Sequence, residues 1–261
     1  HECPHSRFKF ALVVVSRQKL QRKTFSLSGN CKRGVVLDGP QAVELFRACQ
    51  KCNTPEGSQT GDTCLTFASF LGSVPVVRAL LEAQADVNTR KKDGASCLLL
   101  AIQNSKAETA KILLGAKADP NLATRAKVAP LGAAAMIMPE LAPALLAAGA
   151  NPNCLTNAEE DTPLTCAAFH GNIDLVRILI DAKAEVNRAT TIGTAAIGVA
   201  AGHDHKDSQG RCAHIARSGS QPEYPGIVLT LLEAGANPNT LANNKRDTVL
   251  TYAAFRGWED V

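Results

Sequence analysis

The chain has 261 residues, 45% of them hydrophobic, which is enough for a buried core. Its net charge of +4 is uneven, because residues 1–34 carry eight Lys or Arg against one acid, whereas residues 61–261 carry 18 basic and 20 acidic side chains. The apolar run at 11–15 is too short for a secretory signal, and no run approaches about 18 residues, which excludes a membrane span. We therefore expect a soluble, intracellular protein, cytoplasmic or nuclear.

The N-terminal segment, residues 1–37, mixes basic residues, Ser and short apolar pieces without a sustained period. We predict a basic, mostly disordered leader with a short strand at 8–15. A basic arm also suits nucleic acid or an acidic membrane, which stays an alternative to a solvated tail. Residues 38–60 follow as a cap and a linker: 38–52 predict an amphipathic helix covering the exposed end of the next domain, from the spacing of Ala42, Leu45, Phe46 and Cys49.

The nine cysteines point to a reducing compartment, because several fall on predicted helices, where cysteine behaves as a small buried hydrophobe. Cys49 and Cys52 form a C-x-x-C pair, which suits a redox pair or half of a zinc site. No second C-x-x-C exists in the sequence, so two incidental helix cysteines are the default interpretation.

Two periodic patterns dominate the rest of the chain. Leu65, Leu98, Leu131 and Leu164 stand 33 residues apart, each followed three residues later by Ala. A second series of Asn residues closes similar short stretches at intervals of 33, 32, 34 and 52 residues: Asn88, Asn121, Asn153, Asn187 and Asn239. A fixed period of this length indicates a repeat array in which each unit stacks on its neighbours.

The first repeat shows how such a unit is built. Thr63 suits a helix N-cap, Gly72 suits the end of that helix, and the spacing of apolar residues predicts a second helix over 74–84. In the fourth repeat, residues 162–171 (TPLTCAAFHG), followed by LVRILI and AEVN, resemble the ankyrin repeat. That family's unit is a turn plus two antiparallel helices. The resemblance covers 61–261, about five and a half repeats, and implies an all-α fold: an α-solenoid with extended turn tips.

The repeats depart from the family pattern in identifiable places. The family's opening histidine, which ties the turn to its neighbour, is replaced by Thr66, Leu99, Gly132, Thr165 and Thr251. Pro139 and Pro143 should shorten or bend the helices of the third repeat. The fifth repeat contains an insertion at about 203–225, expected to project as a loop. The sixth stops at Val261 inside its second helix, which we interpret as a protein that continues further or a truncated product.

Candidate chemistry in the sequence is sparse. The insertion holds four metal-type donors within a short loop, but their spacing matches no common zinc pattern, so they are weak candidates: His203, His205, Cys212 and His214. No Gly-rich phosphate loop, nucleophile elbow or His-Glu-x-x-His pattern is present. We therefore predict neither an enzyme nor a bound cofactor.

The resemblance implies surface recognition instead, on the concave side of the stack. The expected positions are the residues before each helix-ending Gly: Phe70, Leu71, Gln103, Asn104, Met136, Ile137, Phe169, His170, Phe255 and Arg256. Contact with the neighbouring repeat is the alternative for each. The turn tips add a basic patch that faces an acidic one, namely Arg90, Lys91, Lys92, Arg125 and Lys127 against Glu159, Glu160 and Asp161.

The leading hypothesis is therefore a non-catalytic scaffold that holds another protein, of unknown identity, on its concave face. The alternative is a targeting or regulatory segment of a larger enzyme or channel whose catalytic part lies outside this chain.

Overall fold

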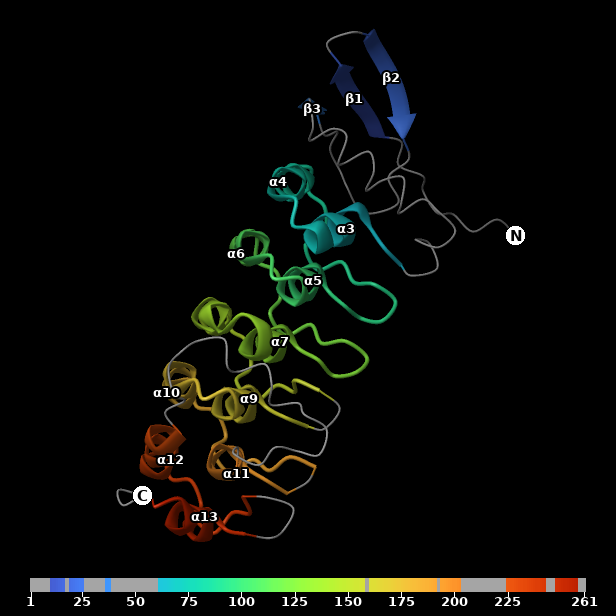
Figure 1. The fold of residues 1–261 in the computed structure, drawn as a ribbon. Helices are drawn as coiled ribbons and strands as arrows, with labels where there is room; N and C mark the ends of the chain where they lie inside the picture. The colour runs from blue at the N-terminus through green and yellow to red at the C-terminus, as the bar shows by residue number, and fades with distance from the viewer. Residues whose placement is uncertain are drawn as a thin grey trace, which may run out of the picture. The chain divides into compact units, whose positions relative to one another are not determined.

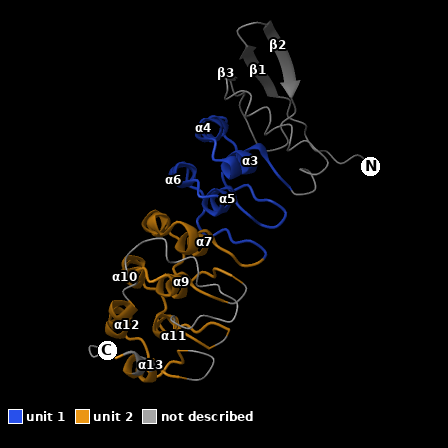
Figure 2. Ribbon diagram, viewed as in Figure 1, with its two compact units in different colours: residues 1–125 blue, residues 126–261 orange. Residues whose placement is uncertain are grey.

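The computed structural model describes residues 10–16, 19–25, 36–38, 61–157, 160–191, 193–202, 224–242 and 247–257. The chain divides into two compact units, unit 1 (residues 1–125) and unit 2 (residues 126–261) (Figure 2). Within the described ranges, no helix combines the length and apolar character needed to cross a membrane. The cap predicted at 38–52 and the linker at 53–60 lie outside the described residues, except for Asp38.

A three-stranded sheet lies in the leader. Strand β1 (Phe10–Ser16) pairs antiparallel with β2 (Lys19–Phe25) and parallel with β3 (Val36–Asp38), in the order β2-β1-β3 (Figure 1). Strand β1 agrees with the short strand expected at 8–15, because β-branched valines favour strands. The sequence analysis did not predict β2 and β3, since the basic residues of β2 interrupt any apolar pattern. The structure thus adds a sheet where little regular structure was expected.

Unit 1 contains two helix pairs. Helices α3 (Cys64–Leu71) and α4 (Val74–Glu82) form the first repeat, and α5 (Cys97–Gln103) and α6 (Ala107–Gly115) form the second. Thr63 caps α3 by accepting a hydrogen bond from the N–H of Thr66 at 3.2 Å. Gly72 ends α3 in the left-handed region, at φ 77°. The predicted cap and helix end are both confirmed.

Unit 2 continues the same pattern. Its third repeat contains α7 (Pro130–Ile137), a 3₁₀ turn η1 (Pro139–Leu141) and α8 (Ala142–Ala147). The fourth repeat consists of α9 (Pro163–Phe169) and α10 (Ile173–Asp181), and the fifth of α11 (Ala196–Gly202) and α12 (Tyr224–Glu233). Helix α13 (Val249–Arg256) begins the sixth repeat. The short α8 and the 3₁₀ turn confirm the effect expected of Pro139 and Pro143. Because α12 begins at Tyr224, the predicted loop ends slightly too late, and residues 203–223 lie outside the described ones.

Within each unit the first helices of the repeats pack in one row and the second helices in another (Figure 1). In unit 1, α3 packs on α5 and α4 on α6; in unit 2, α7, α9, α11 and α13 form the row of first helices. The periodic leucines Leu65, Leu98, Leu131 and Leu164 are all buried in these rows. Their burial and that of the alanines beside them supply the main hydrophobic stabilisation of the array.

The periodic asparagines link successive turns. The side-chain oxygen of Asn88 accepts a hydrogen bond from the N–H of Asp119 at 2.8 Å, and that of Asn153 accepts from Glu185 at 2.7 Å. Asn187 makes the equivalent bond to a residue 50 positions later, Asn237, also at 2.7 Å. The second periodic pattern therefore reflects hydrogen bonds between one repeat and the next within each unit.

The threonines that replace the family histidine bond within their own repeat. Thr66, Thr165 and Thr251 each donate a hydrogen bond to the carbonyl three residues earlier, at 2.8–2.9 Å. These bonds close the start of each repeat's own helix, because a threonine hydroxyl is too short to reach further. The tie to the neighbouring turn expected from the family is thus replaced by a local cap.

Glycine fills the same position in two other repeats of unit 2. A Cβ at Gly132 would lie 2.8 Å from the Leu155 carbonyl oxygen, and a Cβ at Gly198 would overlap the carbonyl oxygen of Leu241. The turn of the following repeat therefore approaches these helices so closely that only glycine fits. The equivalence of Gly198 to Gly132 was not predicted, since the fifth repeat has the least regular sequence.

Candidate functional site

The described residues provide no metal-binding cluster: no group of three or more His, Cys, Asp or Glu among them is placed to hold an ion. The weak candidates His203, His205, Cys212 and His214, like the Cys49–Cys52 pair, lie outside the described residues. The role of the basic leader in binding nucleic acid or an acidic membrane also stays a prediction, because its side chains are not described.

The buried cysteines behave as hydrophobic residues. Cys64, Cys97 and Cys166 are buried, as expected from their positions on repeat helices. Burial raises the pKa of the Cys97 thiol and of the Cys166 thiol to about 12 each. A thiol with such a pKa holds almost no thiolate at neutral pH, so neither side chain suits nucleophilic or redox chemistry.

Two of the first helices, α3 and α7, expose large apolar side chains at their C-terminal ends. Phe70 and Leu71 at the end of α3 are 45% and 46% exposed, and Met136 and Ile137 at the end of α7 are 50% and 44% exposed. Leu65 and Ala68 of α3 are buried in the core, whereas Phe70 and Leu71 are the last two residues of the helix and stay exposed. The structure thus leaves two of the predicted binding pairs accessible, one in each unit.

Phe70 borders a small hollow in unit 1. Its ring stacks on that of Phe67, with centroids 6.5 Å apart and planes at 17°. The hollow has a volume of about 90 Å³ and is lined by Asp62, Thr66, Phe67, Phe70, Lys91 and Leu100. Lys91 and Asp62 form an ion pair across it, with 3.2 Å between Nζ and Oδ1. Apolar walls therefore meet a charged pair at one place.

The corresponding residues of α5 are polar. Gln103 is exposed. Asn104 donates its side-chain N–H to the carbonyl of Leu100 at 2.8 Å, so that amide is engaged at the end of its own helix. Of this predicted pair, Gln103 is the residue whose side chain is available to a partner.

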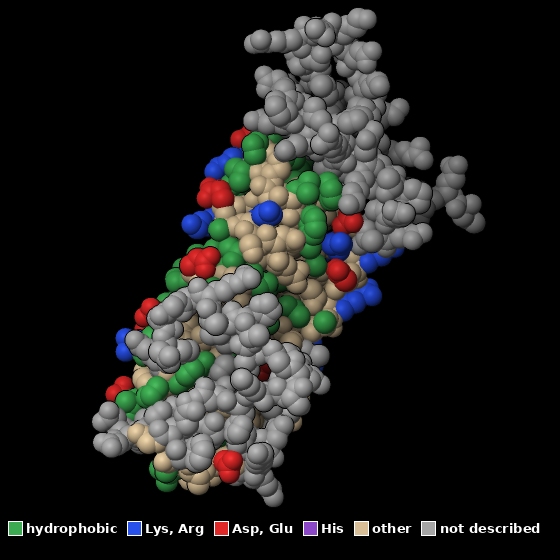
Figure 3. All heavy atoms as spheres, in the orientation of Figure 1, with side chains coloured by type: hydrophobic (Ala, Val, Ile, Leu, Met, Phe, Trp, Pro, Cys, Tyr) green, Lys and Arg blue, Asp and Glu red, His purple; other side chains and the backbone are tan. Residues whose placement is uncertain are grey.

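The basic tip residues of unit 1 have structural roles as well as charge. The Arg90 guanidinium donates to the carbonyls of Gly94 and Ala123, at 3.0 and 2.6 Å, and so fastens two successive turns together. Lys92 and Arg125 are exposed. On the face drawn in Figure 3, hydrophobic side chains of the repeats lie between edges that carry charged ones.

The remaining members of the predicted charge pattern belong to unit 2. Lys127 is exposed, and Asp161 accepts a hydrogen bond from the Asn157 side-chain amide at 2.7 Å. Glu160 is half-buried, and Glu159 lies outside the described residues. The proposed opposition of a basic and an acidic patch stays a prediction.

Phe169 and His170 are less accessible than Met136 and Ile137. Both are half-buried, and their rings meet edge to face with centroids 5.3 Å apart. The hydroxyl of Tyr224 donates to the Phe169 carbonyl at 3.3 Å, and burial lowers the pKa of His170. The alternative interpretation, contact with a neighbouring repeat, thus applies in part at this pair. The side chains of Phe255 and Arg256 are not described.

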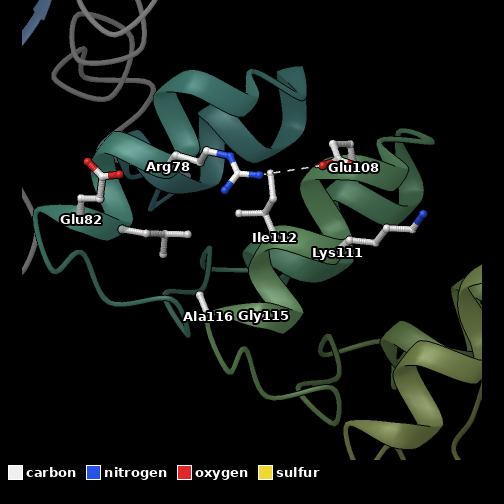
Figure 4. A pocket seen from close by; sticks show the side chains of 8 residues that line it. Arg78, Glu82, Glu108, Lys111, Ile112, Gly115 and Ala116 are labelled. Carbon is white, nitrogen blue, oxygen red and sulfur yellow. Dashed lines mark ion pairs between the residues drawn. The ribbon is translucent and has the colours of Figure 1, made fainter.

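Two features were not singled out as candidate sites from the sequence. A hollow of about 490 Å³ lies between the outer helices α4 and α6, where Arg78 and Glu108 approach to 4.0 Å across it (Figure 4). The acidic and basic residues that line this hollow form no pattern in the sequence that would indicate a site. Leu250 on α13 is 64% exposed, although its position in the repeat corresponds to the buried Leu164.

Known proteins share the sequence pattern. The family model described as "Ankyrin repeats (3 copies)" matches residues 35–124 and 131–209. A transient receptor potential cation channel subfamily A member 1 homolog of Caenorhabditis elegans is 30% identical over 169 residues, which are 63% of this chain and 14% of that protein. Cyclin-dependent kinase 4 inhibitor B of Rattus norvegicus is 32% identical over 110 residues, which are 42% of this chain and 85% of that protein.

The fold has matching solved structures. The crystal structure of an ankyrin repeat domain from Acinetobacter baumannii has a TM-score of 0.61 and 28% identity, covering 74% of this chain and 91% of its own. The chain spans only part of the length of three curated relatives, namely 3%, 14% and 42%. Related repeats thus occur both in small proteins and within much larger ones.

Proposed function

Because the chain belongs to the ankyrin-repeat family, whose repeats bind other proteins, we propose that it holds a partner protein through the exposed ends of first helices in each unit. The observation that carries this proposal is the exposure of two apolar pairs, Phe70–Leu71 and Met136–Ile137, at equivalent positions in the two units. Large apolar side chains that stay in water mark interaction sites, because covering them is favourable. Burial of such side chains also tends to supply most of an interface's affinity.

We propose further that the chain has no catalytic activity of its own. Ankyrin repeats are typically non-catalytic interaction modules. The high pKa of the buried thiols Cys97 and Cys166 supports the same conclusion. Because free buried cysteines persist in a reducing environment, we propose an intracellular location, in the cytoplasm or nucleus.

A pull-down from the native extract tests the proposal. The variants are the double substitutions Phe70→Ala with Leu71→Ala, and Met136→Ala with Ile137→Ala, each replacing one exposed pair. Leu250→Ala is the matched control, since it removes exposed apolar area elsewhere. We expect a partner that is lost with at least one double variant and kept by the control.

Retention of every partner by both double variants would contradict binding at these helix ends. Circular dichroism spectra of the variants must match that of the parent chain, so that loss of a partner is not loss of the fold.

A second candidate is a regulatory segment within a larger enzyme or channel. The similarity to the channel homologue supports it, because the matching region is 14% of that protein. The full-length transcript distinguishes the two: an open reading frame that joins these repeats to membrane-spanning or catalytic sequence supports the second candidate, and one that encodes repeats alone supports the first.

A further inference from the structure

The hollow beside Phe70 has the size and walls of a pocket for one aliphatic side chain. Phe67, Phe70 and Leu100 supply apolar surface around about 90 Å³. Liquid water occupies about 30 Å³ per molecule, so the hollow has room for about three waters. A branched aliphatic side chain displaces a similar volume. Filling the hollow would also cover part of the exposed Phe70 ring.

The surroundings of the hollow are positively charged. Lys91 lines the hollow, and its chain neighbours Arg90 and Lys92 add two cations on the same turn, against Asp62 in the hollow and Asp93 on that turn. The aliphatic part of the Lys92 side chain packs against Gly61: a Cβ placed at Gly61 would lie 3.1 Å from Lys92 Cγ. The Arg90 guanidinium donates to the carbonyl oxygens of Gly94 and Ala123, which carry no formal charge to neutralise it.

The ion pair between Lys91 and Asp62 shows that a carboxylate can bind at the hollow. Asp62 holds Lys91 at 3.2 Å, and their side chains are 15% and 24% exposed. Both charges are thus partly shielded from water but still reachable from the surface. A carboxylate from outside would meet the same ammonium group and would compete with Asp62 for it.

From this arrangement we infer that unit 1 binds an acidic protein segment carrying one aliphatic anchor residue. The anchor enters the hollow against Phe67, Phe70 and Leu100. The flanking carboxylates lie against Lys91 and Lys92. Charge complementarity selects an acidic over a basic segment, because like charges at the turns oppose approach. This inference rests on the binding function proposed above and specifies the partner of its unit 1 part.

Selection from a random peptide library on the intact chain tests the inference. We expect enrichment of peptides with a Leu, Ile or Val flanked by Asp or Glu. Affinities of an enriched peptide should fall at least about tenfold with Phe70→Ala and with Lys91→Glu. They should also fall as NaCl rises from about 0.05 M to about 0.5 M, since salt screens exposed charges.

Asp62→Asn supplies a change in the opposite direction. It removes the competing carboxylate, so we expect the peptide to bind about threefold more tightly, a gain that misfolding would not produce. Lys111→Glu on the outer helix α6 is the matched charge control and should leave the affinity unchanged.

The outcomes separate the two proposals. Enriched peptides that are neutral or basic, yet still lost with Phe70→Ala, would overturn the acidic partner and leave the binding function standing. The absence of any enrichment would overturn the inference as well. Partner binding that is unchanged when the apolar pairs of both units are replaced by alanine would count against the proposed function itself.

Discussion

Replacing Gly132 by Ala should destabilise the protein, although the same change stabilises most helices. In an exposed helix interior, Gly→Ala gains about 1 kcal/mol. At Gly132 the new methyl group would lie 2.8 Å from Leu155 O, 2.9 Å from Thr156 Cα and 3.0 Å from Thr156 Cγ2. Because two of these atoms belong to the backbone, the next turn has to move, and overpacking of this kind costs about 3 kcal/mol. The net loss is about 2 kcal/mol.

Gly115→Ala is the control with the opposite expected sign. Nothing lies within 4 Å of a Cβ at the end of α6, so the helix preference acts there without a clash. We expect Gly115→Ala to be neutral or stabilising by up to about 1 kcal/mol. Gly198→Ala should cost more than Gly132→Ala, because its methyl group would overlap the Leu241 carbonyl oxygen.

Urea unfolding followed by circular dichroism measures the effect. With a slope of about 3 kcal/mol/M, a loss of 2 kcal/mol lowers the midpoint by about 0.7 M. A Gly132→Ala variant at least as stable as the parent chain would refute the reasoning, since it would mean that the following turn does not press against α7.

Three further predictions concern single groups. Thr109→Val should stabilise the protein by about 1 kcal/mol in urea unfolding, because the buried Thr109 hydroxyl has no hydrogen-bond partner among the described residues. Burial lowers the pKa of His170 below 6.5, so the unfolded chain binds the proton more readily and stability should fall as the pH drops from about 7 to about 5. Cys97 and Cys166 in the native chain should react with iodoacetamide about 10³-fold more slowly than in the unfolded chain, by peptide mass spectrometry, since burial raises their pKa from 9.0 to about 12.

Each of these has a contradicting result. A less stable Thr109→Val would show that the hydroxyl has an unseen partner. The His170→Gln variant should lose part of the pH dependence, and an unchanged slope would assign the effect to other groups. Equal alkylation rates in the native and unfolded chains would show that burial in the repeats does not protect these two thiols.

The repeats were predictable from sequence because their packing is local and periodic. Leu65 and Leu164 mark the core, and Thr63 and Gly72 mark the ends of α3, through rules that act within a few residues. The unequal exposure of the binding candidates was not predictable. Phe169 is half-buried where Phe70 is exposed, and the Tyr224 hydroxyl reaches the Phe169 backbone from 55 residues away. No short-range pattern encodes such a contact.

The charged candidates show a second limit. Arg90 and Lys91 looked like free tip residues, yet one fastens two turns and the other pairs with Asp62. The hollow between α4 and α6 was also unpredictable, because it is lined in part by Gly115, which lacks the side chain that would fill it. Sequence periodicity indicates which face is buried, but the use of each surface group depends on its neighbours in space.

The asparagine bonds have a consequence for how this protein tolerates change. Asn187 receives the N–H of Asn237 and donates to the Gly235 carbonyl at 3.0 Å, while α11 and α12 pack together. The register of the fifth repeat is therefore fixed by contacts on either side of residues 203–223, whatever the number of residues between them. We therefore expect this segment to tolerate insertions, so that its length and sequence can differ between close relatives. A reporter domain inserted there should leave the stacking of the repeats intact.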